Sequence, residues 1–97
     1  MRDESRRRGL RIEEAEAIGV KALGFIATDP VLLRRFLNLS GISADEIRVA
    51  ARAPGFLAGV LQFIVNHEPT LVAFAEGTGV PAADVMLALR ALPGGGE

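Results

Sequence analysis

The chain repeats a pattern of turn and apolar residues after 38 or 39 positions. Asp29-Pro30 recurs as Glu68-Pro69, and Gly41-Ile42 recurs as Gly79-Val80. Four further matches are Leu32 with Leu71, Phe36 with Phe74, Ile47 with Val85, and Arg52 with Arg90. A fixed period marks a supersecondary unit that is used more than once. The pattern predicts two pseudo-repeated three-helix units; the alternative is that recurrent capping residues align by chance in a chain rich in Leu and Ala.

Capping residues indicate where the individual helices begin and end. Asp29 can accept hydrogen bonds from free backbone N–H groups, and Pro30 suits the first helical position. Gly41 can take the left-handed conformation that ends a helix. Ser43 and Glu46 match a capping box at the start of the next helix. Five of the expected helices cover roughly residues 11–27, 30–40, 43–52, 54–66 and 81–92. The remaining one, fifth in order, follows Glu68-Pro69 and ends near Gly77 or Gly79.

No segment shows the pattern of a β-strand. The sequence has no alternating apolar run, no Tyr and no Trp, and few β-branched threonines. The predicted fold class is therefore all-α, a compact bundle of about six short helices. We expect a charged flexible tail at residues 1–10, a single helical domain at 11–92 and a Gly-rich flexible tail at 93–97.

The expected helix 54–66 is the most apolar of the six. Its apolar residues cover roughly 200° of the helix circumference, about twice what a surface helix needs. We expect it to be the most buried helix, with Leu57, Val60, Leu61 and Ile64 in the core. Phe56 and Phe63 lie towards one edge of the arc and are predicted to stay exposed. That edge predicts self-association or a helical partner; the alternative is a domain that closes around this helix completely.

The sequence contains no constellation of residues that indicates catalysis or cofactor binding. It has no Cys, which excludes disulfides, thiolate metal sites and Cys nucleophiles. His67 is the only histidine, and one His without Cys or a second His does not make a zinc site. The glycines at 94–96 lack the Lys-Ser/Thr of a phosphate loop. We expect a protein that is not an enzyme and that has no cofactor, metal or small-molecule substrate.

Four arginines, Arg34, Arg35, Arg48 and Arg52, form a candidate basic patch on the second and third expected helices. Such a patch would dock an acidic partner, but a solvated face with Asp45 and Glu46 as local counter-ions is the favoured interpretation. The turn at residues 39–43 also has the spacing of a helix-turn-helix motif. Asp45 and Glu46 occupy the first turn of its would-be recognition helix, where DNA binding needs Lys or Arg. Nucleic-acid binding is therefore disfavoured.

Charge and hydropathy favour a cytoplasmic protein without a membrane segment. Residues 1–52 carry ten Lys/Arg against eight Asp/Glu, a net of +2, and residues 53–97 carry one against four, a net of −3. This asymmetry is too small to indicate a nucleic-acid or membrane partner. The N-terminus has no apolar run typical of a signal peptide, and the most apolar stretch, residues 55–65, is about half a bilayer span.

Several segments resemble a bacterial family of small helical proteins of unknown function. The match includes Thr28-Asp29-Pro30 and Leu39-Ser40-Gly41, and it extends over roughly residues 12–92. The segments that carry it are residues 22–30, 35–41, 56–63 and 71–75. The resemblance implies a stand-alone cytosolic helical protein and supplies no activity, ligand or catalytic residue. The function we expect is a non-enzymatic protein–protein interaction module, and the alternative is a helix-turn-helix-like, DNA-associated regulator.

Overall fold

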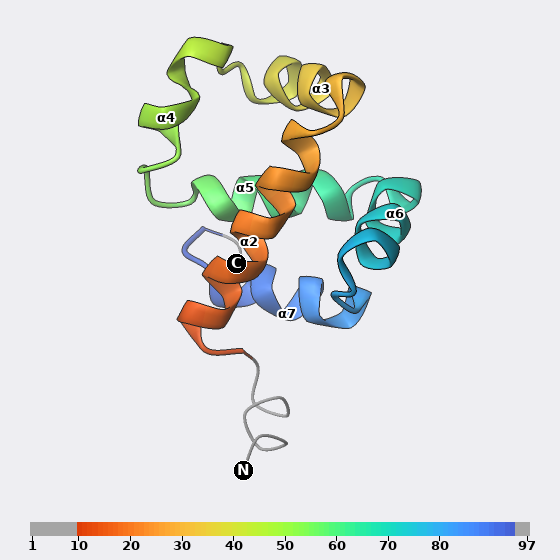
Figure 1. Ribbon diagram of the computed structural model, residues 1–97. Coiled ribbons are helices and arrows are strands. Elements are labelled where there is room, and N and C mark those ends of the chain that lie inside the picture. Colours follow the sequence, from red (N-terminus) through yellow and green to blue (C-terminus); the bar gives the residue numbers. More distant parts are fainter. Residues whose placement is uncertain (1–9, 95–97) are drawn as a thin grey trace.

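Helices α2 and α5 cross at the centre of the structure, and α3, α6 and α7 pack around them (Figure 1). The computed structural model describes residues 10–94, so most of the two predicted tails, 1–9 and 95–97, lies outside the described residues. Within residues 10–94 there are six α-helices, one 3₁₀ turn and no strand, which confirms the all-α prediction. The elements are α2 (Ile12–Ala27), α3 (Pro30–Ser40), η1 (Ala44–Glu46), α4 (Ile47–Ala50), α5 (Phe56–Val65), α6 (Glu68–Thr78) and α7 (Ala82–Ala91).

Side chains close to the helix starts cap the free backbone groups. Asp29 Oδ1 accepts hydrogen bonds from the N–H groups of the second and third residues of α3, at 3.0 and 3.3 Å. The Ser43 N–H donates to Glu46 Oε1 at 3.1 Å, which is the glutamate arm of the predicted capping box. The Arg11 N–H donates to Glu14 Oε1 in the same way, at 3.0 Å. These local bonds explain why the helix starts follow from the sequence.

The core is formed mainly by α2, α5 and α7, which pack against one another. The largest fully buried side chains are Ile26, Val60, Leu61, Ile64, Phe74 and Val85. Gly19 of α2 faces Leu57 of α5 so closely that a Cβ added at Gly19 would lie 3.0 Å from the Leu57 Cβ. The absence of a side chain at this position therefore allows the two central helices to approach.

Helix α5 has the largest buried share of any helix, as predicted, but its buried face differs from the prediction. Val60, Leu61 and Ile64 are in the core. Leu57 is only half-buried, although it packs against the core and faces Gly19 of α2. Ala58 is buried as well. Since α7 also packs against α5, a second part of its circumference is covered.

The repeat holds along the backbone with one offset, 38. Helix α6 has the bounds of α3 shifted by 38 residues, and α2 and α5 end at equivalent positions. Gly41 and Gly79 end the equivalent helices α3 and α6 in the left-handed conformation, with φ of +75° and +80°. The predicted offset of 39 at the helix start is wrong. The N-cap of α6 is His67, not Glu68, because Pro69 occupies the second helical position.

Two aromatic pairs obey the same offset and join the two halves. Phe25 of α2 meets Phe74 of α6 edge to face, with ring centroids 5.5 Å apart. Phe63 of α5 meets Phe36 of α3 in the same way, also at 5.5 Å. After the offset of 38, Phe25 is equivalent to Phe63, and Phe36 is equivalent to Phe74. The repeat therefore maps one aromatic pair onto the other. The first helix of each half therefore packs against the second helix of the other half, as in two units related by an approximate two-fold axis.

The third helices break this symmetry. Helix α7 packs against α2 and α5, whereas α4 is held away from both (Figure 1). The first turns of α2, residues 12–17, correspond after the offset to residues 50–55, which are the last residue of α4 and the loop before α5. Helix α5 is therefore shorter than α2, and α4 lacks the turns against which it would pack. The predicted helix 43–52 is accordingly a 3₁₀ turn followed by a single helical turn.

Candidate functional site

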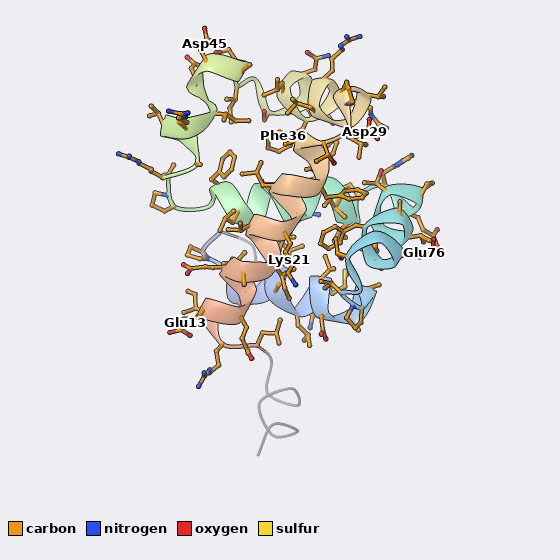
Figure 2. All side chains as sticks on the ribbon, in the orientation of Figure 1. Glu13, Lys21, Asp29, Phe36, Asp45 and Glu76 are labelled. Carbon is orange, nitrogen blue, oxygen red and sulfur yellow. The ribbon has the colours of Figure 1, made fainter. Side chains whose placement is uncertain are left out.

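An open groove of about 450 Å³ lies between α3 and α5. Figure 2 shows one of its residues, Phe36, between these two helices. The groove is lined by Phe36, Leu39, Ser40, Ile42, Gly55, Phe56, Gly59, Gln62, Phe63 and Asn66. No lining residue carries a charge. The groove has the size and apolar character of a binding site.

Three phenylalanine rings form the floor of the groove. Phe36 lies edge to face against Phe63, with an interplanar angle of 79°, and against Phe56, with centroids 6.1 Å apart and an angle of 89°. Phe36 and Phe56 are buried, and Phe63 is half-buried. Because aromatic rings in this arrangement hold one another in place, the floor is preformed.

The rim of the groove combines an exposed leucine with an exposed glycine. Leu39, at the end of α3, is 74% exposed although it is one of the largest apolar side chains of the protein. Gly59, in the middle of α5, is exposed, and a Cβ added there would find no heavy atom within 4 Å. Gly59 therefore leaves room for another chain to approach α5 closely.

The polar groups at the groove bond mainly to neighbouring residues. The Gln62 amide donates from Nε2 to Asn66 Oδ1 at 2.8 Å. The Ser40 hydroxyl donates to the Leu37 carbonyl at 3.3 Å and accepts from the Ile42 N–H at 3.4 Å. These groups are not arranged to converge on one ligand atom. The groove is therefore suited to recognise apolar side chains and not to position a reacting group.

The predicted interaction residues are distributed in two sets. Phe56 and Phe63 both line the groove, but Phe56 is buried at 8% exposure, contrary to the prediction, because the ring packs against Phe36. Arg34, Arg35, Arg48 and Arg52 are all exposed, and none of them lines the groove. Arg34 and Arg35 lie on α3, one wall of the groove, whereas Arg48 lies on α4 and Arg52 in the turn after α4.

Leu39, Gly59 and Gln62 are groove residues that the sequence prediction did not include. Of these three residues, only Leu39 could have been recognised from the sequence. It is a leucine that lies off the buried stripe of its helix, to which Phe36 belongs. Gly59 and Gln62 have no such signal. They acquire a role only because α3 lies beside them.

A second, smaller pocket of about 210 Å³ lies at the loop between α4 and α5. It is lined in part by Glu16 of α2, Arg52 and Leu92. Gly55 lines both pockets, so the loop between α4 and α5 lies between the groove and this second pocket. Among the predicted arginines, Arg52 is thus associated with this pocket and not with the groove.

The turn that resembles a helix-turn-helix motif leads into an unusually short helix. Helix α4 has four residues, which is about 6 Å of helix. Figure 2 shows Asp45 at the outer edge of η1, on the side away from α5. The Glu46 carboxylate bonds to the Ser43 N–H. A recognition helix needs several turns to place side chains on base edges, and α4 does not provide them.

The remaining candidate chemistry is structural. His67 is the N-cap of α6, and its ring Nδ1 lies 2.8 Å from the Thr70 hydroxyl oxygen. Within residues 10–94 no group of three His, Asp or Glu residues could hold a metal ion, and no buried side-chain nitrogen or oxygen atom lacks a hydrogen-bond partner. In the same region no single helix is long and apolar enough to cross a membrane. Helices α6 and α7 together reach the length and composition, but they are bent by 105° at the break.

Comparison with known proteins gives a family match. The model of the family described as "Protein of unknown function (DUF3572)" matches residues 12–95. The chain belongs to this family. No curated protein and no solved structure matches the chain. The match includes all six helices and the groove, so the DUF3572 chain presents the groove as part of the family domain.

Proposed function

We propose that this DUF3572 protein is a non-enzymatic interaction module that binds an apolar segment of another protein in the groove between α3 and α5. The observation that carries the proposal is an exposed leucine, Leu39, beside a preformed floor of three phenylalanines. Apolar patches with aromatic residues at their centre are typical of protein interfaces. Aromatic side chains in pockets supply much of the binding energy there.

The chemistry of the groove supports binding over catalysis. No lining residue is titratable, and the lining hydroxyl of Ser40 bonds to backbone groups of its own helix end. General acid–base or nucleophilic catalysis needs such groups to point at a common position. We therefore propose a cytoplasmic protein that works without a cofactor or a small-molecule substrate.

The alternative, a DNA-associated regulator, has less support. It requires a recognition helix, and α4 has only four residues. It also requires several Lys or Arg residues on phosphates. Two acidic residues, Asp45 and Glu46, occupy η1 directly before α4, and Arg48 and Arg52 come only after them.

Site-specific photo-crosslinking in the native cell tests the proposal. A photoreactive phenylalanine analogue at Leu39 is expected to capture a defined protein, because this side chain is exposed at the groove. The matched control is the same analogue at Val20, which is 59% exposed on α2 and lines neither pocket. Capture of the same proteins from both positions, or of none from Leu39, would refute an interaction at the groove.

A further inference from the structure

We propose that the occupant of the groove is an amphipathic helix of another protein, with acidic residues beside its apolar face. This inference rests on the proposed function and adds the chemistry of the partner. Two independent features of the structure carry it. One is the shape of the apolar lining, and the other is the charge of the helices that border it.

The groove matches the apolar face of a short helix. Helix α5 is ten residues long, which gives a wall of about 15 Å. A helix that binds in a groove uses apolar anchors at i, i+3 or i+4, and i+7, which extend over about 10 Å. Gly59 near the middle of this wall lets the partner backbone come close, and Leu39 on the opposite wall is free to pack between its anchors.

The borders of the groove carry more positive than negative charge. Helix α5 has no charged residue, and α3 has Arg34 and Arg35 without an acid between Pro30 and Ser40. Arg35 lies one turn before Leu39, on the same side of α3. Arg35 is therefore placed to attract acidic residues that flank the partner's apolar anchors, and Arg34 adds to the positive charge of the same helix.

The nearby acids do not cancel this charge at the groove. Asp29 caps the far end of α3, through hydrogen bonds from backbone N–H groups. Asp45 is directed away from α5 (Figure 2), and the Glu46 carboxylate accepts from the Ser43 N–H. Arg48 on α4 and Arg52 in the turn after α4 add further positive charge to this part of the molecule, although neither lines the groove. The field over the groove is therefore positive on balance.

The same charge argues against a second copy of this chain as the occupant. In a two-fold dimer the same surface patch meets itself, so the two α3 helices would bring four arginines to one interface. Like charges brought together at an interface oppose association. A foreign helix with acidic flanks avoids this repulsion.

Selection from a displayed peptide library tests the inference with the full chain as bait. The peptides have about 15 residues, roughly four helical turns, with leucine at i, i+4 and i+7. The positions beside the leucines carry an equal mixture of Glu, Lys and Gln. We expect the selected peptides to be enriched in Glu over Lys. We also expect their affinity to fall about tenfold in the double variant Arg34→Gln/Arg35→Gln, and to weaken with added salt.

A pair of glycine variants shows whether the peptides bind in the groove. Gly59→Gln adds a long side chain at the groove, at a position where a Cβ has no heavy atom within 4 Å, and it is expected to abolish binding. Gly24→Gln introduces the same side chain at an equally open position on α2, outside the groove, and should bind as the wild type does.

The possible results of these experiments test the acidic flanks, the helical occupant and the proposed function separately. Peptides that bind in the groove equally well with Lys or Gln flanks would overturn the acidic helix but leave the proposed function intact. A failure to select any peptide that depends on Gly59 would overturn the helical occupant. The proposed function would then be decided by the crosslinking from Leu39. A concentration-dependent dimer in light scattering that Gly59→Gln abolishes would replace the foreign helix with a second copy of this chain.

Discussion

Gly59 lowers the stability of the helix that contains it. It lies inside α5, is exposed, and has empty space where a Cβ would be. We expect Gly59→Ala to raise the free energy of unfolding by about 0.5–1 kcal/mol, because alanine loses less conformational entropy in a helix. Urea unfolding measures the change. Gly79→Ala is the control and should destabilise the protein, because Gly79 has a φ of +80°. A loss of stability in Gly59→Ala would mean that the space is filled.

Leu61 reports on the core of α5 in the same experiment. Its side chain is fully buried, so Leu61→Ala leaves a cavity and should cost about 2–5 kcal/mol. The control is Val72→Ala on the exposed face of α6, with an expected change within about 0.5 kcal/mol. If Leu61→Ala cost less than about 1 kcal/mol, this residue would not be part of the core.

At the scale of elements, the contact of α2 with α5 depends on a single missing side chain. A Cβ at Gly19 would lie 3.0 Å from the Leu57 Cβ, which is too close for a relaxed contact. Gly19→Ala should therefore force the two helices apart and cost about 1–3 kcal/mol. Gly24→Ala changes the same residue type in the same helix, where nothing lies within 4 Å, and should be stabilising. Equal effects of the two substitutions in thermal or urea unfolding would show that the helices do not meet at Gly19.

The whole molecule depends on contacts that cross between its two halves. Phe25 with Phe74, and Phe36 with Phe63, join helices from different halves. Each half alone has roughly 40 residues, near the lower limit for a chain that folds without a staple. We expect fragments 10–53 and 54–94 to be largely unfolded alone and to regain helicity when mixed. Far-UV circular dichroism measures this, and native-like helicity in either isolated fragment would show that the halves fold independently.

The helices themselves were predictable because their limits depend on neighbouring residues. Asp29-Pro30 and Gly41 predicted the bounds of α3, and both ends are as the structure shows them. A helix cap and a left-handed glycine involve only residues that are close together in the sequence. The ends of the helices can therefore be predicted from short segments. The same reasoning misplaced the start of α6 by one residue, because Pro is compatible with both of the first two helical positions.

The sequence by itself determined the fold class, the limits of α3 and the approximate limits of the other long helices, and it indicated a repeat that the structure keeps in the first two helices of each half. The tertiary structure alone decided which parts of the apolar surface are covered. Burial of Phe56 depends on Phe36, and the exposure of Leu39 depends on the short α5 and on the isolated α4. Helix limits result from hydrogen bonds between neighbours in the chain. Burial results from contacts between segments far apart in it, and periodicity shows that a face is apolar without showing what packs against it.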